Sequence, residues 1–360
     1  MERELHLSAT EIGLLAALPA AFFGIAALAG SLLITRFDAL RTAIAGLVIA
    51  GVASAMRGFA DDVLALYAAT AAMGAGVAIM HPALPSLVRQ WLPARVSFGS
   101  AVYTNGLLVG ETLPVALTVP VLLPLLSNSW RGSLIAWSIP LLLIAMAAYW
   151  AAPGPRAFET TQNNTSAWWP NWGDRRIWQG GLVLGAVAST YFGTCAFVPS
   201  YLAASGRADL VTPVLTALNL SQLPASFVML AMADRLERRV FPFIVVGVFM
   251  MASLAGLVAT ASMWTIAFAA MLGAAIAAAI TLALALPALL SRPTEVAQIS
   301  AAVFTIGYIE ALLISILAGS VADETADIRL AFLPILVSLV PFLVVPPTIQ
   351  LGGSGDVTTS

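Results

Sequence analysis

Long apolar segments constrain the fold of this 360-residue chain more than any other feature. Hydrophobic residues make up 60% of the sequence and charged residues only 9%. A bilayer core needs about 20 apolar residues per helix. Segments near or above that length are 12–35, 42–59, 63–88, 97–126, 130–152, 177–204, 211–232, 240–260, 263–290, 298–321 and 330–347. We therefore expect an all-α polytopic membrane protein with eleven transmembrane helices.

Charge and composition exclude several classes of function. The 16 basic residues are all arginines and are balanced by 18 acidic residues, so the chain has no basic face for nucleic acid. One cysteine excludes a disulfide framework, and one cysteine with two histidines argues against a conventional metal cage, so we expect no cofactor. An enzyme or membrane sensor would need a catalytic cluster or an extramembrane domain. The short connectors offer neither, so we expect a protein that is not an enzyme.

The arginines are distributed unevenly between alternate connectors, which predicts the orientation in the membrane. One side carries eleven: Arg36, Arg41, Arg89, Arg95, Arg156, Arg175, Arg176, Arg235, Arg238, Arg239 and Arg292. The other side carries five: Arg3, Arg57, Arg131, Arg207 and Arg329. The arginine-rich side should be cytoplasmic, with the N-terminus outside and the C-terminus inside.

Three short motifs recur in the same order, at offsets of 201 to 205 residues. The pairs are 18–22 with 223–227, 83–87 with 285–289, and 101–104 with 302–305. Such collinear repeats are typical of transporters built from two parallel halves. We expect an N-terminal half at 1–152, a cytoplasmic linker at 153–176, a C-terminal half at 177–350 and a flexible tail at 351–360.

The two expected halves differ by one helix. Segment 177–204 has no counterpart in the first half, because its counterpart would lie before residue 1. We expect an architecture of twelve helices from which this chain lacks the first. A misassigned start codon and a genuine eleven-helix variant both explain this difference.

The motifs of the chain resemble those of the major facilitator superfamily. Asp234-Arg235-Leu236-Glu237-Arg238-Arg239 is similar to the acidic-basic loop signature of that superfamily. The first-half loop keeps Arg36 and Arg41 but has Ile34 where the acidic residue is expected. The resemblance implies a gating role for Arg36, Arg41, Asp234, Arg235, Arg238 and Arg239. Motifs such as 82–87, 91–93 and 217–224 further resemble the branch of cyanate permeases and nitroimidazole exporters.

Two glutamates, Glu111 and Glu310, sit in the middle of apolar segments, roughly 18–21 Å from a helix end. An ionised carboxylate at such depth costs at least about 2.5–3.5 kcal/mol. Offset 201 maps Glu310 onto Val109, two residues from Glu111, so the two positions are nearly equivalent. We expect one or both to bind protons or a cationic group. The alternative is a buried glutamate that is hydrogen-bonded for packing alone.

Other polar residues inside the apolar segments are candidates for the substrate cavity: Asn219, Ser221, Gln222, Tyr103, Thr104, Asn105, His81, Tyr191 and Thr194. Amide side chains donate and accept hydrogen bonds, which suits a small polar solute. The competing interpretation is interhelical hydrogen bonding, worth about 0.6 kcal/mol per bond. For His81, next to a proline, a local hydrogen bond is favoured over proton relay.

These patterns predict a secondary active transporter in the bacterial inner membrane. We expect it to act as a monomer on a small-molecule substrate, by alternating access and with proton coupling. The resemblance implies a cyanate-permease-like activity; the alternative is efflux of drugs or other organic compounds. A non-transporting sensor and an inactive truncated chain are further alternatives.

Overall fold

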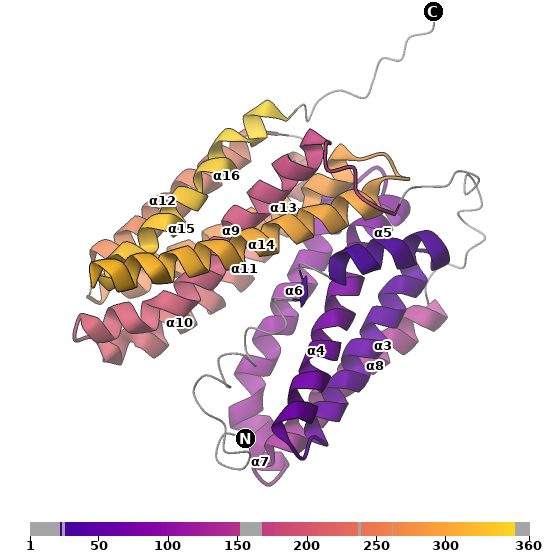
Figure 1. Ribbon diagram of the computed structural model, residues 1–360, viewed down its shortest axis with the longest axis horizontal. Helices are drawn as coiled ribbons and strands as arrows, with labels where there is room; N and C mark the ends of the chain where they lie inside the picture. Colours follow the sequence, from indigo (N-terminus) through magenta and orange to yellow (C-terminus); the bar gives the residue numbers. More distant parts are fainter. Residues whose placement is uncertain (1–21, 24–25, 152–167, 237–238, 261, 350–360) are drawn as a thin grey trace, which may run out of the picture. The chain divides into compact units, whose positions relative to one another are not determined.

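The computed structural model describes residues 22–23, 26–151, 168–236, 239–260 and 262–349. These residues form helices and connectors without a β-strand (Figure 1). Helix Ala26–Phe37 comes first among the long elements. It is followed by α3 (Ala39–Gly58), α4 (Val63–Met80), α5 (Ala83–Trp91), α6 (Val96–Leu117), a π-helical turn (Thr118–Leu122), α7 (Leu123–Leu125) and α8 (Trp130–Ala151). The later helices are α9 (Arg175–Ala204), α10 (Val211–Leu220), α11 (Gln222–Leu236), α12 (Phe241–Ala259), α13 (Trp264–Leu290), α14 (Val296–Thr325), α15 (Phe332–Ser338) and α16 (Val340–Val344).

The expected apolar segments coincide with these helices. Within the described ranges, nine helices or helix pairs are long and apolar enough to cross a membrane. The expected segment 97–126 is α6 followed by the π-helical turn and α7. Segment 12–35 is described only in part, as helix Ala26–Phe37. The tail at 351–360, most of the linker and residues 18–21 of the motif at 18–22 lie outside the described residues.

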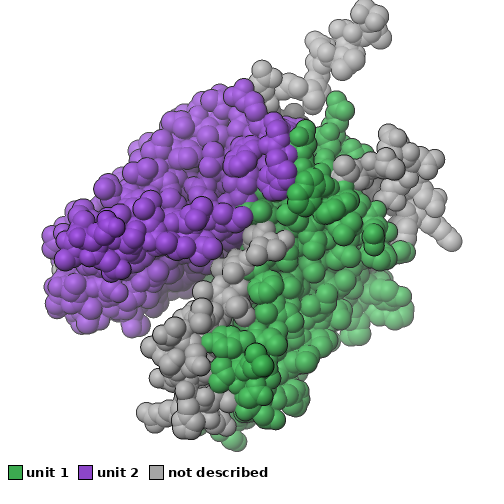
Figure 2. Space-filling view, in the orientation of Figure 1, with its two compact units in different colours: residues 1–91, 110–171, 292–305 green, residues 92–109, 172–291, 306–360 purple. Residues whose placement is uncertain are grey.

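Contacts divide the chain into two compact units, coloured separately in Figure 2. Unit 1 comprises 1–91, 110–171 and 292–305, and unit 2 comprises 92–109, 172–291 and 306–360. Helices α6 and α14, which the internal repeat predicts to be equivalent, each contribute to both units. Each unit is therefore built mainly, but not wholly, from one half of the sequence.

Unit 1 is held together by close contacts of α3 with α4 and α8. Gly46 and Gly76 let the backbones of α3 and α4 approach, since a Cβ on either would overlap the other helix. Small residues allow this close packing in membrane helices, where no hydrophobic force drives association. At the far end of α3, the Arg131 guanidinium donates to the carbonyls of Gly58 and Ala60. This arginine therefore satisfies the C-terminal carbonyls of α3 from the start of α8.

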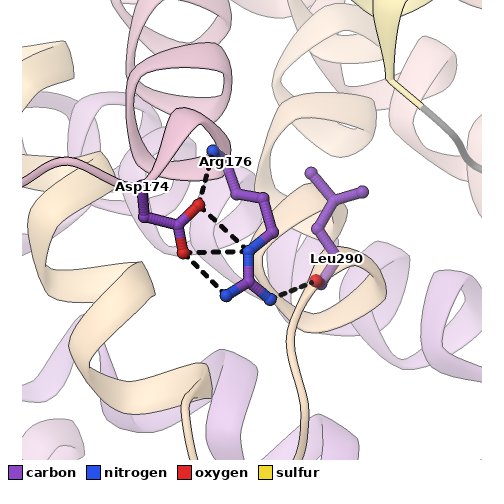
Figure 3. A network of polar contacts seen from close by, with 3 residues as sticks. All are labelled: Asp174, Arg176 and Leu290. Atoms are coloured by element: carbon purple, nitrogen blue, oxygen red, sulfur yellow. Dashed lines mark hydrogen bonds and ion pairs between the residues drawn. The ribbon is translucent and has the colours of Figure 1, made fainter. Parts of the chain in front are cut away.

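Unit 2 is organised around α9 and α13, whose residues are mostly buried. The α9 helix begins at the Asp174 cap, where the Asp174 carboxylate accepts from the backbone N–H of Arg176. The Arg176 guanidinium bonds the same carboxylate and also donates to the Leu290 carbonyl at the end of α13 (Figure 3). One arginine thus connects the N-terminus of α9 to the C-terminus of α13.

Three of the expected single segments are interrupted, and segment 330–347 divides at Leu339 into α15 and α16. Segment 63–88 divides at His81 and Pro82 into α4 and α5, because proline cannot donate the helical hydrogen bond. Segment 211–232 divides at Ser221 into α10 and α11, three residues before Pro224. Pro287, by contrast, lies inside an uninterrupted α13. A proline in the sequence therefore indicated where a break can occur, and packing decided where it does.

Candidate functional site

Helices α9 and α14 pack along a line of small residues in unit 2. A Cβ on Gly181 would overlap Ile306, and a Cβ on Gly185 would overlap the Glu310 carboxyl group. Further along the same pair, Phe197 lies against Gly319. The two helices thus run in the same direction and touch at both ends of this stretch. We call this contact the α9–α14 seam, from Gly181 and Ile306 to Phe197 and Gly319.

The Glu310 carboxyl group lies within this seam. Its Oε2 atom is fully buried and has no hydrogen-bond partner among the described residues. No arginine or histidine of the described chain forms an ion pair with it. A buried charge without a partner is costly, whereas a protonated carboxyl group is not charged. This carboxyl group is therefore suited to bind and release a proton.

A second polar group in unit 2 surrounds the break between α10 and α11. The Tyr191 hydroxyl on α9 donates to Asn219 Oδ1 at 2.9 Å, and Gln222 Nε2 approaches the same oxygen at 3.5 Å. Asn219 Nδ2 donates to the Leu215 carbonyl at 2.8 Å. Tyr191 is 28 residues from Asn219 in the sequence, and Gln222 is three residues after Asn219. The fold brings the three side chains together. We call Tyr191, Asn219 and Gln222 the amide–phenol cluster.

Backbone packing supports the broken segment beside this cluster. Gly273 of α13 faces the Leu218 carbonyl and the Ser221 hydroxyl, and a Cβ at this position would overlap both. Ser221 itself donates to the Leu218 carbonyl at 3.2 Å, within its own segment. Of the predicted group, Ser221 therefore stabilises the break, whereas Asn219 accepts from Tyr191 and Gln222 approaches Asn219.

The remaining candidates of unit 2 divide into satisfied and unsatisfied side chains. Tyr103 donates to the Leu284 carbonyl of α13 at 3.2 Å, and Thr104 donates to the Ser100 carbonyl of its own helix at 2.8 Å. Asn105 is only 6% exposed, and neither polar atom of its amide has a partner among the described residues. The Thr194 hydroxyl is likewise buried without a partner. Asn105 and Thr194 keep free hydrogen-bonding capacity, whereas Tyr103 and Thr104 use theirs.

The candidates of unit 1 have different surroundings. Glu111 is exposed on α6, three residues before Pro114. His81 is buried between the rings of Phe23 and Phe304, with centroid distances of 5.2 and 5.0 Å. Its Nδ1 lies 2.9 Å from the Val77 carbonyl, which agrees with the local hydrogen bond favoured by the sequence. The two predicted glutamates therefore differ: Glu310 is packed in a seam and Glu111 is not.

The predicted gating-loop residues lie at helix ends. Arg36 and Arg41 are exposed, and Arg41 pairs with Asp38, the residue that caps α3. Ile34, which stands where the superfamily's acidic residue is expected, is buried, and the acidic partner of Arg41 is Asp38. At the second loop, Arg235 lies in the last turn of α11, and Arg239 is exposed. Arg238 and the Asp234 side chain lie outside the described part of the structure.

Sequence reasoning missed the small residues that build the seam. Gly181, Gly185 and Ser189 recur every four residues on α9, which places them along one side of the helix. Gly193, the next residue in this series, faces Ile335 of α15 instead. This spacing is visible in the sequence and is the signal that could have identified the seam. Which helix packs on it is not visible, because glycine carries no chemical preference for a partner.

No group of three or more histidine, cysteine, aspartate or glutamate side chains in the described ranges is placed to hold a metal ion.

Comparisons with known proteins agree with this architecture. The model of the Major Facilitator Superfamily matches residues 1–313. The uncharacterized transporter YycB of Bacillus subtilis (strain 168) is 25% identical over 344 residues, which cover 94% of this chain and 84% of that relative. The 2-nitroimidazole transporter of Escherichia coli (strain K12) is 26% identical over 206 residues, or 56% of this chain and 51% of that relative.

Solved structures show the same fold. A crystal structure of FucP, a Major Facilitator Superfamily transporter in the outward conformation, aligns with a TM-score of 0.70 at 12% identity, covering 97% of this chain and 91% of that one. A variant of the fucose:proton symporter FucP from Escherichia coli aligns with a TM-score of 0.64 at 13% identity, covering 98% and 93%. With the helical architecture and the family match over most of its length, the chain belongs to the Major Facilitator Superfamily and is an integral membrane transporter.

Proposed function

We propose that the chain is a secondary active transporter that moves a small solute by alternating access and couples this movement to proton binding at Glu310. The observation that carries the proposal is the buried Glu310 Oε2 in the α9–α14 seam, without a hydrogen-bond partner among the described residues. Protonation removes the charge and lets the seam close around the group. Deprotonation makes the closed seam unfavourable, because an ionised carboxylate at this depth costs about 2.5–3.5 kcal/mol.

The amide–phenol cluster supports a neutral, planar, polar organic compound as the substrate. Amide and phenol groups both donate and accept hydrogen bonds, so they recognise polar edges without selecting a charge. The similarity to a 2-nitroimidazole transporter is compatible with export of such a compound. The alternative is uptake of a cyanate-like anion together with protons. It is supported by the branch resemblance and by Arg57, whose Nε is buried without a partner in the described structure.

Exposed tryptophans mark the ends of the membrane helices, and the arginines give the orientation. Trp91, Trp150, Trp168, Trp169 and Trp178 are exposed at or next to connectors on the arginine-rich side, and Trp264 is exposed next to a connector on the other side. Tryptophan favours the membrane–water interface, and arginine favours the cytoplasmic side. We therefore propose a cytoplasmic-membrane location with the arginine-rich connectors and the C-terminus facing the cytoplasm. We also propose that a single chain forms the transporter.

Flux measurements on the purified chain in proteoliposomes test this function. With 2-nitroimidazole as the probe, an imposed pH gradient should drive accumulation by the parent protein. Glu310→Gln should abolish the response to the gradient while leaving exchange of the probe. Glu324→Gln is the matched control, because this glutamate lies on the same helix but is exposed near its end.

The outcomes separate the alternatives. Parent flux that ignores the pH gradient would refute proton coupling, and a gradient response that survives Glu310→Gln would refute the role of this residue. Cyanate uptake in place of 2-nitroimidazole flux would favour the anion alternative. Tyr191→Phe removes only the hydroxyl that bonds Asn219, so it should weaken probe binding by about fivefold, as expected for one neutral hydrogen bond.

A further inference from the structure

Ser189 belongs to a small set of buried hydroxyls that have no hydrogen-bond partner among the described residues, with Ser100, Thr194, Ser253, Ser291 and Ser300. Thr104, Thr190 and Thr281 each donate to the carbonyl four residues earlier, at 2.8 Å. Ser189 is 0% exposed, yet its Oγ makes no hydrogen bond within the described structure. Because an unpaired hydroxyl in an apolar interior is costly, its presence calls for a partner in another state of the protein.

The position of Ser189 identifies that partner. Ser189 lies one helical turn beyond Gly185, the residue that contacts the Glu310 carboxyl group. Side chains four residues apart on a helix are neighbours on one face. The α9–α14 seam continues past this point to Phe197 and Gly319. Ser189 therefore lies one turn beyond the Glu310 contact, between Gly185, which faces Glu310, and Gly193, which faces Ile335 of α15. The Glu310 Oε2 atom is itself buried and has no partner among the described residues.

We propose that Ser189 is a positioning residue for proton binding: its hydroxyl donates a hydrogen bond to the ionised Glu310 carboxylate and releases it when the carboxyl group is protonated. Rotation of the two side chains, or one bridging water, spans the separation of one turn. In this proposal the structure, in which Ser189 Oγ and Glu310 Oε2 are unpaired, represents the protonated state. A neutral carboxyl group gains less from the Ser189 donor than an ionised carboxylate does. The inference rests on the proposed role of Glu310 as the proton-binding group.

Few other side chains on α9 and α14 could change the proton affinity of Glu310. On α9, which packs against this part of α14, the titratable side chains beyond Gly185 are Tyr191, Cys195 and Tyr201, and the Tyr191 hydroxyl already bonds Asn219. On α14, Tyr308 is two residues away and interacts with Tyr103. The charged residues of these two helices lie at their ends: Arg175, Arg176, Asp323 and Glu324. Ser189 is thus the donor best placed to respond to the charge of Glu310.

The test is a pH titration of the Glu310 carboxyl group by infrared spectroscopy of the full-length protein in proteoliposomes. The carbonyl-stretch band that disappears in Glu310→Gln is assigned to this residue. Ser189→Ala should move the midpoint of this band upward by about one pH unit, since a hydrogen bond to a charged group is roughly twice as strong as one to a neutral group. The pH midpoint of 2-nitroimidazole flux should move in parallel.

Ser253→Ala is the matched control. Ser253 is also 0% exposed with an unpaired Oγ, but it lies on α12, away from the seam. It should leave the midpoint of the Glu310 band unchanged. A Ser189→Ala midpoint that stays constant, moves downward, or moves no more than that of Ser253→Ala would overturn the inference.

The infrared titration distinguishes this inference from the proposed function. If Glu310→Gln keeps a normal response to the pH gradient, the coupling role fails, whatever Ser189 does. If that response is lost but Ser189→Ala leaves the band unmoved, the coupling role stands and the inference about Ser189 alone is wrong.

Discussion

Replacing Gly185 by alanine would place a methyl group against the Glu310 side chain. An ideal Cβ at this position would lie 2.5 Å from Cδ and 2.9 Å from Cβ of Glu310, whereas ordinary contacts are 3.4–4 Å. Helix α14 or the Glu310 side chain must therefore shift by about 0.5–1 Å, and overpacking of this kind costs about 1–3 kcal/mol. Alanine also favours the helix over glycine by up to about 1 kcal/mol.

Gly106→Ala on α6 is the control for the helix preference of alanine over glycine. A Cβ on Gly106 would meet no atom within 4 Å, so only the helix preference should act there. The difference in stability between the two variants thus isolates the overlap at the seam. We expect Gly185→Ala to be less stable than Gly106→Ala by about 1–3 kcal/mol.

Thermal unfolding in detergent measures this difference. Cys195, the one cysteine of the chain, lies half-buried on α9, so a thiol-reactive dye reports the unfolding of this helix. Gly185→Ala should unfold several degrees below Gly106→Ala, and adding Glu310→Ala should restore part of the loss, because it removes Cδ and the carboxyl oxygens but keeps the Cβ at 2.9 Å. If Gly185→Ala is as stable as Gly106→Ala, the close contact between α9 and Glu310 is wrong.

Substitutions at three further residues test the helix ends. Arg131→Met removes the donor to two carbonyls at the end of α3 and should destabilise the protein by about 1–3 kcal/mol in the same unfolding assay. Asp38→Ala removes the cap of α3 while keeping its unusual φ of 93°, so it should cost about 0.5–2 kcal/mol, whereas Asp38→Gly should cost less because glycine tolerates that φ. Hydrogen bonding from Arg176 lowers the pKa of Asp174, so this pair stabilises the folded state above the unfolded-state pKa of aspartate. The contribution should be lost as the pH falls through the lower folded-state value, and Asp174→Asn should remove that part of the acid sensitivity.

The membrane character and family of the protein could be predicted from the sequence, because both depend on composition and local pattern. Apolar segments of bilayer length can only be helices in lipid, since every backbone polar group must be satisfied within the segment. The repeated motifs and the loop signature can be recognised without knowing how the helices pack. The same local reasoning selected Glu310, because a carboxylate inside an apolar segment is costly in any arrangement of helices.

The surroundings of the candidate residues depend on which helices touch. Glu111 and Glu310 look alike in the sequence, yet one is exposed and the other is packed against Gly185. Tyr191 and Asn219 are 28 residues apart and meet through the packing of separate helices. The sequence by itself determined which residues are unusual for a membrane interior. Only the tertiary structure decided which of them have partners, because partners come from close approach of backbones at glycines and from helix breaks that local preference leaves open.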